Sequence, residues 1–320
     1  MKPLIILTGP TAVGKTALSI RLAKAIGGEI ISADSMQVYR RMDIGSAKIT
    51  KEEMMGVPHH LIDVLEPSEE FNVTVFQTMA KAAVEEIYSR GHIPIVAGGT
   101  GFYIQALLND IDFTETGEDT SIRTELEKIA EEKGADYLHG LLLIIDPESA
   151  RQIHANNVKR VVRAIEFYRQ TGERISEHNK REREKKSPYD FLYFVVNTDR
   201  DTLYQRIDKR VDQMVELGLV EEVKQLKESG CTRDMVSMQG LGYKEILDYL
   251  QGEHSLEEAL YLLKRDTRHF AKRQITWFKR EKDVRWLNLP DYGYDLDKVL
   301  EKMIEDINER YGLENKATWK

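Results

Sequence analysis

Apolar and polar positions along the first hundred or so residues follow a rhythm of alternating strands and helices. Short apolar runs beside turn residues are typical of buried strands, and longer stretches with apolar residues every three or four positions are typical of helices. The predicted strands are residues 4–7, 29–32 and 92–97, and the predicted helices are residues 17–24, 72–90 and 102–108. Strands that alternate with helices form a parallel sheet covered on both faces, with ligands at the carboxyl ends of the strands.

The pattern changes near residue 109 and changes back near residue 187. Between these points the chain is charged and helical, and residues 191–197 then form an apolar run that returns to the sheet. The remainder is predicted to be helical, with helices at residues 200–217, 220–228, 243–250 and about 256–280, and with frayed last residues. We therefore expect a core of residues 1–108 and 188–320 and a helical insertion domain of residues 109–187.

The composition, with 41% hydrophobic and 31% charged residues, is that of an ordinary water-soluble chain. No apolar run approaches the roughly 18 residues that span a membrane. The first strand follows Met1 so closely that we expect no signal peptide. The one cysteine, Cys231, excludes an internal disulfide and a cysteine-based zinc site. We expect a cytoplasmic protein.

The charge is unevenly distributed along the chain. The formal net charge of −8 is a weak argument against nucleic-acid binding. However, residues 159–186 hold ten Lys and Arg against five Asp and Glu, and residues 264–285 hold nine against three. Both stretches contain aromatic residues, among them Tyr168 and Trp277. Basic stretches with stacking side chains are typical of RNA or DNA binding, and two solvated amphipathic helices would give the same pattern.

A phosphate-binding pattern, G-x-x-x-x-G-K-[ST], lies between the first predicted strand and the first predicted helix. It consists of Gly9, Pro10, Thr11, Ala12, Val13, Gly14, Lys15 and Thr16. In such a loop the backbone N–H groups face a phosphate chain, and the helix N-terminus adds positive potential. Lys15 would reach the terminal phosphate and the Thr16 hydroxyl would hold Mg²⁺. The pattern predicts an α/β fold like that of P-loop NTPases, but it does not identify the phosphates as those of ATP.

Two further polar residues follow predicted strands at the same edge of the sheet. Asp34 follows the second strand, and Thr100 lies in the turn Gly98-Gly99-Thr100-Gly101 after the third. A carboxylate at this edge can bind a metal or accept a proton from a nucleophile. An aspartate that only caps a turn would occupy the same position.

Arg206 and Arg210 lie four positions apart in a predicted helix and therefore share one face. Two guanidinium groups on one face can clamp a pyrophosphate. The same helix contains several acidic residues, so a salt-bridged surface helix is the alternative interpretation. The sequence alone leaves both open.

The apolar run Leu141–Ile145 followed by Asp146 is similar to a Walker B strand, whose aspartate supports Mg²⁺ in kinases and ATPases. Pro147 begins a predicted helix directly afterwards, and the run lies inside the charged insertion. We therefore favour a buried helix, with Asp146 as the N-cap of the next one.

Taken together, these segments resemble the bacterial tRNA dimethylallyltransferases over nearly the whole chain. The resemblance rests on residues 9–16, 32–39, 42–48, 58–63, 97–104, 146–150, 159–166, 239–245 and 271–278. The departures are small: Asn157 stands where the family often has Asp, and Ser46 where Thr is usual. The family's eukaryotic zinc-finger tail is excluded by the single cysteine.

The resemblance implies what the phosphate loop binds. In this family the loop holds the pyrophosphate of dimethylallyl diphosphate, and the acceptor is N6 of adenine 37 in tRNAs that read codons starting with U. Implied partners are therefore tRNA and dimethylallyl diphosphate, with Mg²⁺ on Thr16 as the cofactor, and we expect a monomer that contacts no membrane. The resemblance is also taken to imply nucleotide and ATP binding, and we expect the loop to prefer the diphosphate over a nucleoside triphosphate.

The resemblance also assigns roles to individual residues. Catalysis is assigned to Asp34, Thr100 and Arg210. Diphosphate binding is assigned to residues 9–16 and Arg206. Binding of tRNA, with the insertion as a contact surface, is assigned to Asp34, Ser35, Met36, Gln37, Thr100, Arg123, Lys159, Arg160, Val161, Val162, Arg163, Gln239, Lys244, Lys272 and Arg273.

Two other functions remain as alternatives. A small-molecule kinase of the nucleoside- or shikimate-kinase type shares the loop and the sheet, but it does not account for the basic helices after residue 150. An adenylate isopentenyltransferase, which alkylates free AMP, ADP or ATP, shares the chemistry of Asp34 but needs no surface for RNA.

Overall fold

The computed structural model describes residues 2–113 and 121–312. The chain forms two compact units: a core of residues 1–107 and 189–320, and an insertion of residues 108–188. The last residues, which we expected to be frayed, lie outside the described part of the chain. Within the described ranges, no helix combines the length and the apolar character that crossing a bilayer requires.

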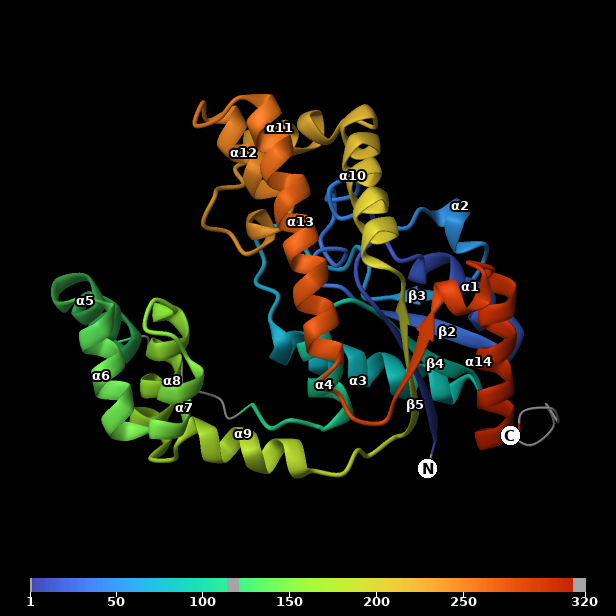
Figure 1. Ribbon diagram of the computed structural model, residues 1–320, viewed down its shortest axis with the longest axis horizontal. Coiled ribbons are helices and arrows are strands. Elements are labelled where there is room, and N and C mark those ends of the chain that lie inside the picture. Colours follow the sequence, from blue (N-terminus) through green and yellow to red (C-terminus); the bar gives the residue numbers. More distant parts are fainter. Residues whose placement is uncertain (1, 114–120, 313–320) are drawn as a thin grey trace. The chain divides into compact units, whose positions relative to one another are not determined.

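The core contains a six-stranded sheet in which every neighbouring pair is parallel (Figure 1). In spatial order the strands are β3 (His59–His60), β2 (Gly28–Ala33), β4 (Ile93–Gly98), β1 (Pro3–Thr8), β5 (Asp190–Asn197) and β6 (Val284–Asn288). Thr8 of β1 lies opposite both Gly98 and Val195, and Ala33 also lies opposite Gly98. The carboxyl ends of the central strands therefore meet at one edge.

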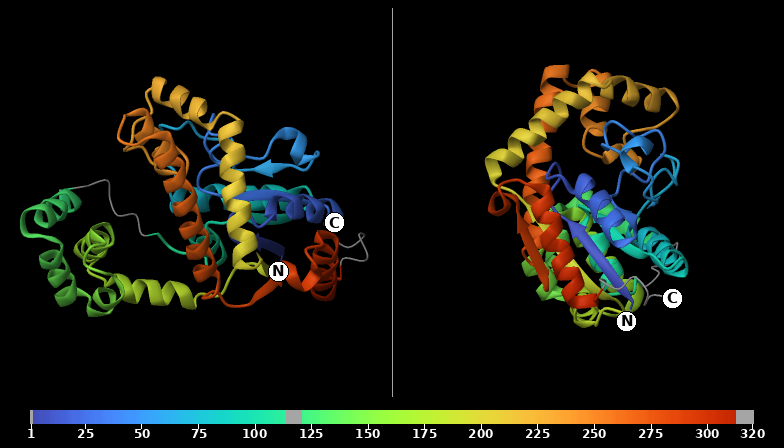
Figure 2. Two further views of the ribbon diagram at one scale, coloured as in Figure 1. Left: turned by 45° about the horizontal axis from the view of Figure 1, so that its top comes forward. Right: turned by 90° about the vertical axis from the view of Figure 1, so that its right-hand side faces the viewer.

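Helices cover both faces of this sheet (Figure 2). Helices α1 (Lys15–Ile26) and α14 (Leu296–Tyr311) contact each other and pack on the face that carries Ile5 and Leu7 of β1. Side chains alternate along a strand, so Leu4 and Ile6 point to the other face. Helix α3 (Val73–Ser89) also contacts β2 and β4, and α4 (Gly101–Leu108) follows β4. The predicted α/β fold is confirmed.

The predicted helices of the core are also confirmed. The observed helices are α3, with Asn72 as its N-cap, α10 (Arg200–Glu216), α11 (Leu219–Glu228), α12 (Tyr243–Leu250) and α13 (Leu256–Phe278). The prediction that the remainder is helical was wrong at β6, and the two-residue β3 was not predicted. Both strands are short and only half-buried, so neither has the apolar pattern of a central strand. The short helix α2 (Lys51–Met54) and α14 complete the set that bears on the argument.

The insertion has its own helical core. It is built from α5 (Ser121–Lys133), α6 (Ala135–Ile145), α7 (Pro147–Gln152), α8 (Val158–Thr171) and α9 (Ile175–Glu184). Leu126, Leu138 and Leu142 pack there against Val161 and Val162 of α8. We expected both valines in the tRNA interface, and for their side chains this was wrong. They lie on the apolar stripe of an amphipathic helix, with 0% and 2% of their surface exposed.

Residues 141–145 belong to helix α6, as expected, and do not form a Walker B strand. Asp146 is the N-cap of α7, and its carboxylate accepts hydrogen bonds from the backbone N–H groups of Ser149 and Ser176, both at 3.0 Å. The expectation that the whole run is buried was wrong. Leu143 and Ile144 are 51% and 80% exposed, because the run is longer than the stripe of α6 that faces the core.

Candidate active site

The phosphate loop joins β1 to α1 with a backbone that suits glycine at two positions. Gly9 and Gly14 have φ angles of 152° and 106°, and Ala12 also has a positive φ of 63°. A Cβ atom on Gly9 would lie 2.3 Å from the carbonyl oxygen of Val196. Helix α1 begins at Lys15, so the N–H groups of the loop lie at a helix N-terminus. This is the geometry of a phosphate site.

The side chain of Lys15 contacts the start of this loop. Its Nζ donates hydrogen bonds to the carbonyl oxygens of Gly9 at 3.0 Å and Pro10 at 2.8 Å. Burial, and then the neighbouring Arg210 charge, lowers the pKa of Lys15 to about 7, while Asp34 acts in the opposite direction. Two cations and one carboxylate therefore lie close together beside the loop and leave a net positive charge. A bound anion would neutralise this charge.

Asp34 caps a turn and also faces the site. Its Oδ1 accepts hydrogen bonds from the backbone N–H groups of Met36 at 2.8 Å and Gln37 at 3.3 Å. Among the described residues, none donates a hydrogen bond to Oδ2. The two interpretations of Asp34 are therefore compatible, because each concerns a different oxygen of the carboxylate.

Thr100 is held next to Asp34 by the sheet. Its backbone N–H donates to the carbonyl oxygen of Ala33 at 3.2 Å. A Cβ atom on Gly98 would lie 2.3 Å from that same oxygen, so the glycine lets the turn after β4 approach the end of β2. Thr100 and Asp34 line one cavity.

Arg206 and Arg210 of α10 both face the phosphate loop. Arg206 donates to the carbonyl oxygen of Val13 at 3.3 Å. Burial lowers the pKa of Arg210, with Asp34 and then Glu53 opposing the shift. Within the described ranges, Arg210 has no hydrogen-bond or ion-pair partner. A half-buried guanidinium without a partner favours the anion clamp over the salt-bridged surface helix.

Two acidic residues of α10 pair with another helix. Asp208 binds Arg268 at 2.5 Å, and Asp212 binds Lys264 at 2.5 Å, so both carboxylates join α10 to α13. Neither of these two carboxylates pairs with Arg210, so the surface-helix interpretation loses these two as partners for it.

Two cavities meet at these residues. The smaller, of about 110 Å³, and the larger, of about 440 Å³, share Asp34 and Arg210 as lining residues. Of the predicted site residues, the smaller is lined by Thr11, Lys15, Thr16, Asp34, Gln37 and Arg210. The larger is lined by Thr11, Ala12, Asp34, Ser35, Met36, Thr100, Arg210, Gln239, Lys244 and Arg273. A phosphate chain in one cavity and a second substrate in the other would meet beside Asp34.

The donors around Thr16 are oxygens, the kind of ligand that Mg²⁺ prefers. The described residues contain no group of three or more His, Cys, Asp or Glu side chains that could hold a metal. Thr16 offers a hydroxyl, and Asp34 offers a carboxylate in the same cavity. Mg²⁺ accepts such a sparse set of oxygen donors when phosphates and water complete its coordination.

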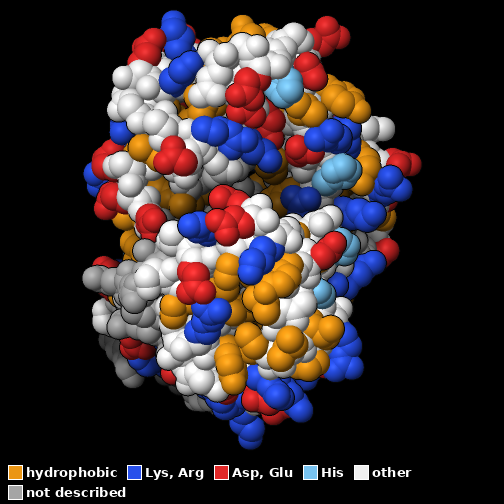
Figure 3. Space-filling model, turned by 90° about the vertical axis from the view of Figure 1, so that its left-hand side faces the viewer, with side chains coloured by type: hydrophobic (Ala, Val, Ile, Leu, Met, Phe, Trp, Pro, Cys, Tyr) orange, Lys and Arg blue, Asp and Glu red, His pale blue; other side chains and the backbone are white. Residues whose placement is uncertain are grey.

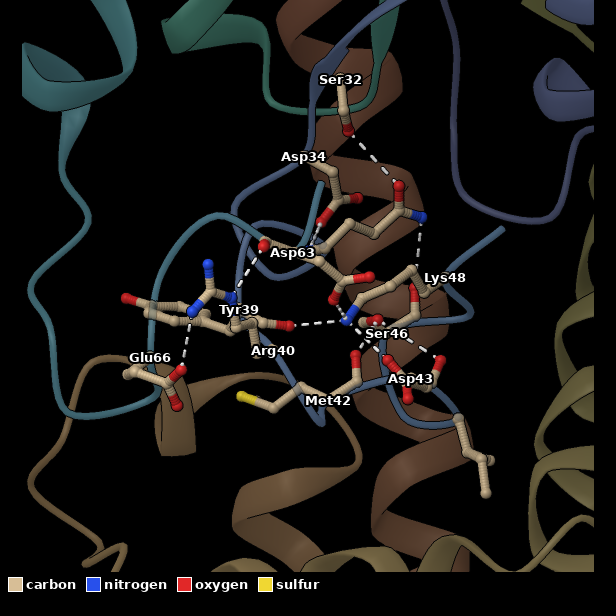
Figure 4. Close-up of polar contacts among 12 residues, drawn as sticks. Ser32, Asp34, Tyr39, Arg40, Met42, Asp43, Ser46, Lys48, Asp63 and Glu66 are labelled. Carbon is tan, nitrogen blue, oxygen red and sulfur yellow. Dashed lines mark hydrogen bonds and ion pairs between the residues drawn. The ribbon is translucent and has the colours of Figure 1, made fainter. Parts of the chain in front are cut away.

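The loop from residue 36 to residue 48 is held by a network that the sequence did not predict (Figure 4). The Lys48 side chain is only 4% exposed, and its Nζ contacts Asp43 at 2.6 Å and Asp63 at 2.5 Å. It also donates to the carbonyl oxygen of Tyr39 at 2.6 Å. This buried ammonium therefore joins the end of the loop to Tyr39 and Asp43 within it and to Asp63 outside it.

Glu222 of α11 holds the same loop from outside. Its carboxylate accepts hydrogen bonds from the backbone N–H groups of Asp43, Ile44 and Gly45 at 2.9, 2.7 and 3.1 Å. The Tyr243 hydroxyl donates to Glu222 at 2.9 Å. A Cβ atom on Gly45 would lie 2.6 Å from the Tyr243 ring. The signal that could have identified Tyr243 is its place in the segment shared with the family.

Gln37, predicted to contact tRNA, is held inward by this loop. Its Oε1 accepts from the Ser32 hydroxyl at 3.3 Å, and its Nε2 donates to the carbonyl oxygens of Ser46 and Ala47 at 3.5 and 3.3 Å. These bonds set the orientation of the side-chain amide in the smaller cavity.

The basic residues predicted to bind tRNA fall into two groups. Lys159 and Arg160 are exposed on α8. Arg123 and Arg163 instead contact the buried carboxylate of Glu166 at 2.8 and 3.3 Å. The second pair therefore neutralises a buried carboxylate within the insertion.

The core carries the remaining predicted tRNA residues. Lys272 and Arg273 are exposed on α13 and line an open groove of about 460 Å³ together with Trp277 and Arg280. Lys244 lies 3.4 Å from Glu245, and Gln239 donates to the carbonyl oxygen of Arg233. Figure 3 shows Lys and Arg side chains interspersed with Asp and Glu on one face of the molecule.

Comparison with known proteins decides the family. The IPP transferase family matches residues 37–281. The chain belongs to this family. It is 62% identical to a tRNA dimethylallyltransferase from Lachnoclostridium phytofermentans over 310 residues, which cover 97% of this chain and 99% of that protein. It is 51% identical to a protein of the same name from Carboxydothermus hydrogenoformans over 304 residues, covering 95% and 96% of the two chains.

Solved structures of this IPP transferase family share the fold. The full-length tRNA isopentenylpyrophosphate transferase from Bacillus halodurans matches with a TM-score of 0.73 and 45% identity, covering 98% of this chain and 99% of its own. A eukaryotic dimethylallyltransferase described as acting on tRNA matches with a TM-score of 0.78 and 35% identity, covering 90% of this chain and 74% of its own.

Proposed function

We propose that this IPP transferase moves a dimethylallyl group from dimethylallyl diphosphate to N6 of adenosine 37 in tRNAs that read codons starting with U. The observation that carries the proposal is the pair of cavities that share Asp34 and Arg210. One cavity has the phosphate loop as a wall and the other has Thr100. The names of the relatives supply the class of substrate.

The reaction breaks the bond between C1 of the allyl group and the diphosphate oxygen, and forms a bond between C1 and N6. Pyrophosphate leaves with the electron pair, and the N6 proton goes to the carboxylate of Asp34. Lys15, Arg210 and the backbone N–H groups of the loop stabilise the negative charge on the departing pyrophosphate. Bound Mg²⁺ on Thr16 would supply further charge neutralisation there. The Thr100 hydroxyl, which lines the larger cavity, would orient the adenine amine.

The adenine must leave the base stack to reach Asp34. The larger cavity is lined by Phe71, Tyr103 and Phe270 as well as polar groups, which suits a flat heteroaromatic base. The exposed cations Lys159 and Arg160 of the insertion, and Lys272 and Arg273 of α13, would bind the RNA backbone. A monomer in the cytoplasm, where tRNA is modified, is part of the same proposal.

The kinase alternative loses its main support in the structure. Asp146 follows a helix and not a strand, and its buried carboxylate accepts hydrogen bonds from Ser149 and Ser176 as the cap of α7. The adenylate isopentenyltransferase alternative would use the same chemistry of Asp34. It differs only in needing no RNA surface.

One experiment separates the three functions. The full chain is incubated with radiolabelled dimethylallyl diphosphate and either unmodified tRNA or AMP, and in parallel with γ-labelled ATP and a set of small acceptors. Transfer of label to tRNA but not to AMP supports the proposal. Transfer to AMP alone would move the protein to the adenylate class, and phosphoryl transfer without prenylation would make it a kinase.

A further inference from the structure

Gln274 connects two loops of the site that are far apart in the sequence. It lies on α13 and is 6% exposed. Its Oε1 accepts a hydrogen bond from the backbone N–H of Thr11 at 2.9 Å, and its Nε2 donates to the carbonyl oxygen of Gly99 at 2.9 Å. One side-chain amide thus joins the phosphate loop to the turn that carries Thr100.

The contact between α13 and this turn is unusually close. A Cβ atom on Gly99 would lie 2.2 Å from Nε2 of Gln274, and one on Gly101 would lie 2.2 Å from the Trp277 ring. Two successive turns of α13 therefore pack closely against Gly99 and Gly101, the residues on either side of Thr100. Because the Thr100 N–H also binds Ala33, the position of Thr100 is set from both the helix and the sheet.

The bond to Thr11 also narrows the set of groups that can bind the diphosphate. The Thr11 N–H is already donated to Gln274, so it is not available to a phosphate oxygen. The N–H groups from Ala12 onward remain for the anion. A neutral amide can accept from the Thr11 N–H and donate to the Gly99 carbonyl at the same time, which an ionised carboxylate cannot do.

We propose that Gln274 is a positioning residue that joins the phosphate loop to the Thr100 turn, so that C1 of the bound allyl diphosphate lies between Asp34 and Thr100. The inference rests on the proposed function, because it concerns the alignment of the same two substrates. Gln274 lines both cavities, as expected of a residue at their junction.

The first test replaces Gln274 with Met in the full-length protein, which keeps the volume and removes both hydrogen bonds. Displacing reacting groups by about 1 Å can cost roughly 10²-fold in rate. We expect the single-turnover rate of tRNA alkylation to fall roughly 10- to 100-fold. We also expect KM for dimethylallyl diphosphate and Kd for inorganic pyrophosphate to rise severalfold, while Kd for tRNA stays unchanged. Gln274→Glu keeps an acceptor for Thr11 but sets a carboxylate against the Gly99 carbonyl, so it should be at least as impaired.

The second test is a double-mutant cycle with Gly99→Ala. On its own, the new methyl group would displace the Gln274 amide and reproduce the loss in rate. In a Gln274→Ala background the space is free, so Gly99→Ala should cost little more. Losses that simply multiply would overturn the proposal, because independent sites behave in that way.

Gln77→Met is the matched control. Gln77 is a buried glutamine of α3 that donates to the carbonyl oxygen of Ala106 at 2.8 Å, away from the phosphate loop. Its loss should lower Tm without changing the kinetics. If Gln274→Met likewise lowers only Tm, Gln274 is structural and the inference is wrong. If the wild-type chain alkylates no tRNA, the proposed function fails instead, and pyrophosphate binding to the Gln274 variants still tests the loop.

Discussion

At the scale of single residues, the site depends on groups that perform two tasks at once. Asp34 caps its own turn with Oδ1 and leaves Oδ2 for chemistry. Arg210 is half-buried and faces the site without a described partner, which is costly unless an anion binds there. A capping role alone would not require Asp34 to line both cavities.

Replacing Asp34 with Asn should leave both substrates bound but slow alkylation by roughly 10²–10⁴, the usual contribution of a positioned general base. The amide keeps an acceptor for the turn but cannot take the N6 proton. Single-turnover rates at several Mg²⁺ concentrations measure the effect. Rescue by excess Mg²⁺, together with weaker diphosphate binding, would make Asp34 a metal ligand instead. A wild-type rate would remove it from the mechanism.

At the scale of elements, one face of helix α8 packs in the core of the insertion and the other presents exposed cations. Val161 and Val162 pack inward, while Lys159 and Arg160 are exposed. The side chains of Arg123 and Arg163 converge on Glu166, which is 2% exposed. A buried carboxylate needs such partners, so these two arginines also stabilise the insertion.

Replacing Lys159 and Arg160 together with Ala should weaken tRNA binding and reduce its dependence on salt. Each lost phosphate contact removes about 0.7–0.9 from the slope of log K against log salt. Filter binding across a salt titration measures this. Arg151→Ala, which removes an exposed arginine that pairs with Glu148 in the same unit, is the control and should leave the slope unchanged. An unchanged slope in the double variant would return α8 to an ordinary solvated helix.

Helix α11 provides a second prediction at this scale. In Glu222→Gln, one acceptor oxygen becomes an NH₂ group that faces backbone donors or the Tyr243 hydroxyl. We expect a loss of about 1–3 kcal/mol in the free energy of unfolding, measured with urea, because buried donors lose their acceptor. Glu221→Gln, one position earlier and exposed, should change it little. Equal stability of the two variants would show that Glu222 does not hold the loop.

At the scale of the whole molecule, one buried carboxylate connects several elements at the amino ends of the strands, the edge of the sheet opposite the site. Glu29, at the start of β2, is 1% exposed. Arg90 donates two hydrogen bonds to this carboxylate, at 2.7 and 2.9 Å. A ring nitrogen of His60 lies 2.7 Å from it, and one of His92 lies 2.6 Å from it. Burial alone would raise the pKa of Glu29, but hydrogen bonds from Arg90 and then the two histidines outweigh it and lower the pKa to about 2.

Because the pKa of Glu29 is lower in the folded protein than in the unfolded chain, the free energy of unfolding falls at acid pH. The stabilisation by Glu29 is fully present above its ordinary pKa of 4.5 and is lost as the pH falls toward about 2. We expect the free energy of unfolding to fall across this window in the wild type, and the fall to be shallower in Glu29→Gln. Denaturant melts at several pH values measure it. Identical slopes for the two proteins would contradict the assignment.

The sequence by itself determined the features that depend on neighbouring residues. The phosphate loop, the cap at Asp146 and the long helices each arise from patterns within a few positions, where side chains and backbone meet without help from the fold. The parallel sheet followed from the alternation of these elements. The family resemblance added the substrates, which no local pattern could indicate.

Only the tertiary structure decided which distant groups meet. Gln274 binds Thr11 and Gly99, and Glu222 binds the loop at Asp43, across separations of 263, 175 and 179 residues. No periodicity encodes such pairs, because a hydrogen bond depends on distance in space and not on spacing in the chain. The strand β6 and the burial of the apolar face of α8 were decided in the same way, since packing overrides weak local preference.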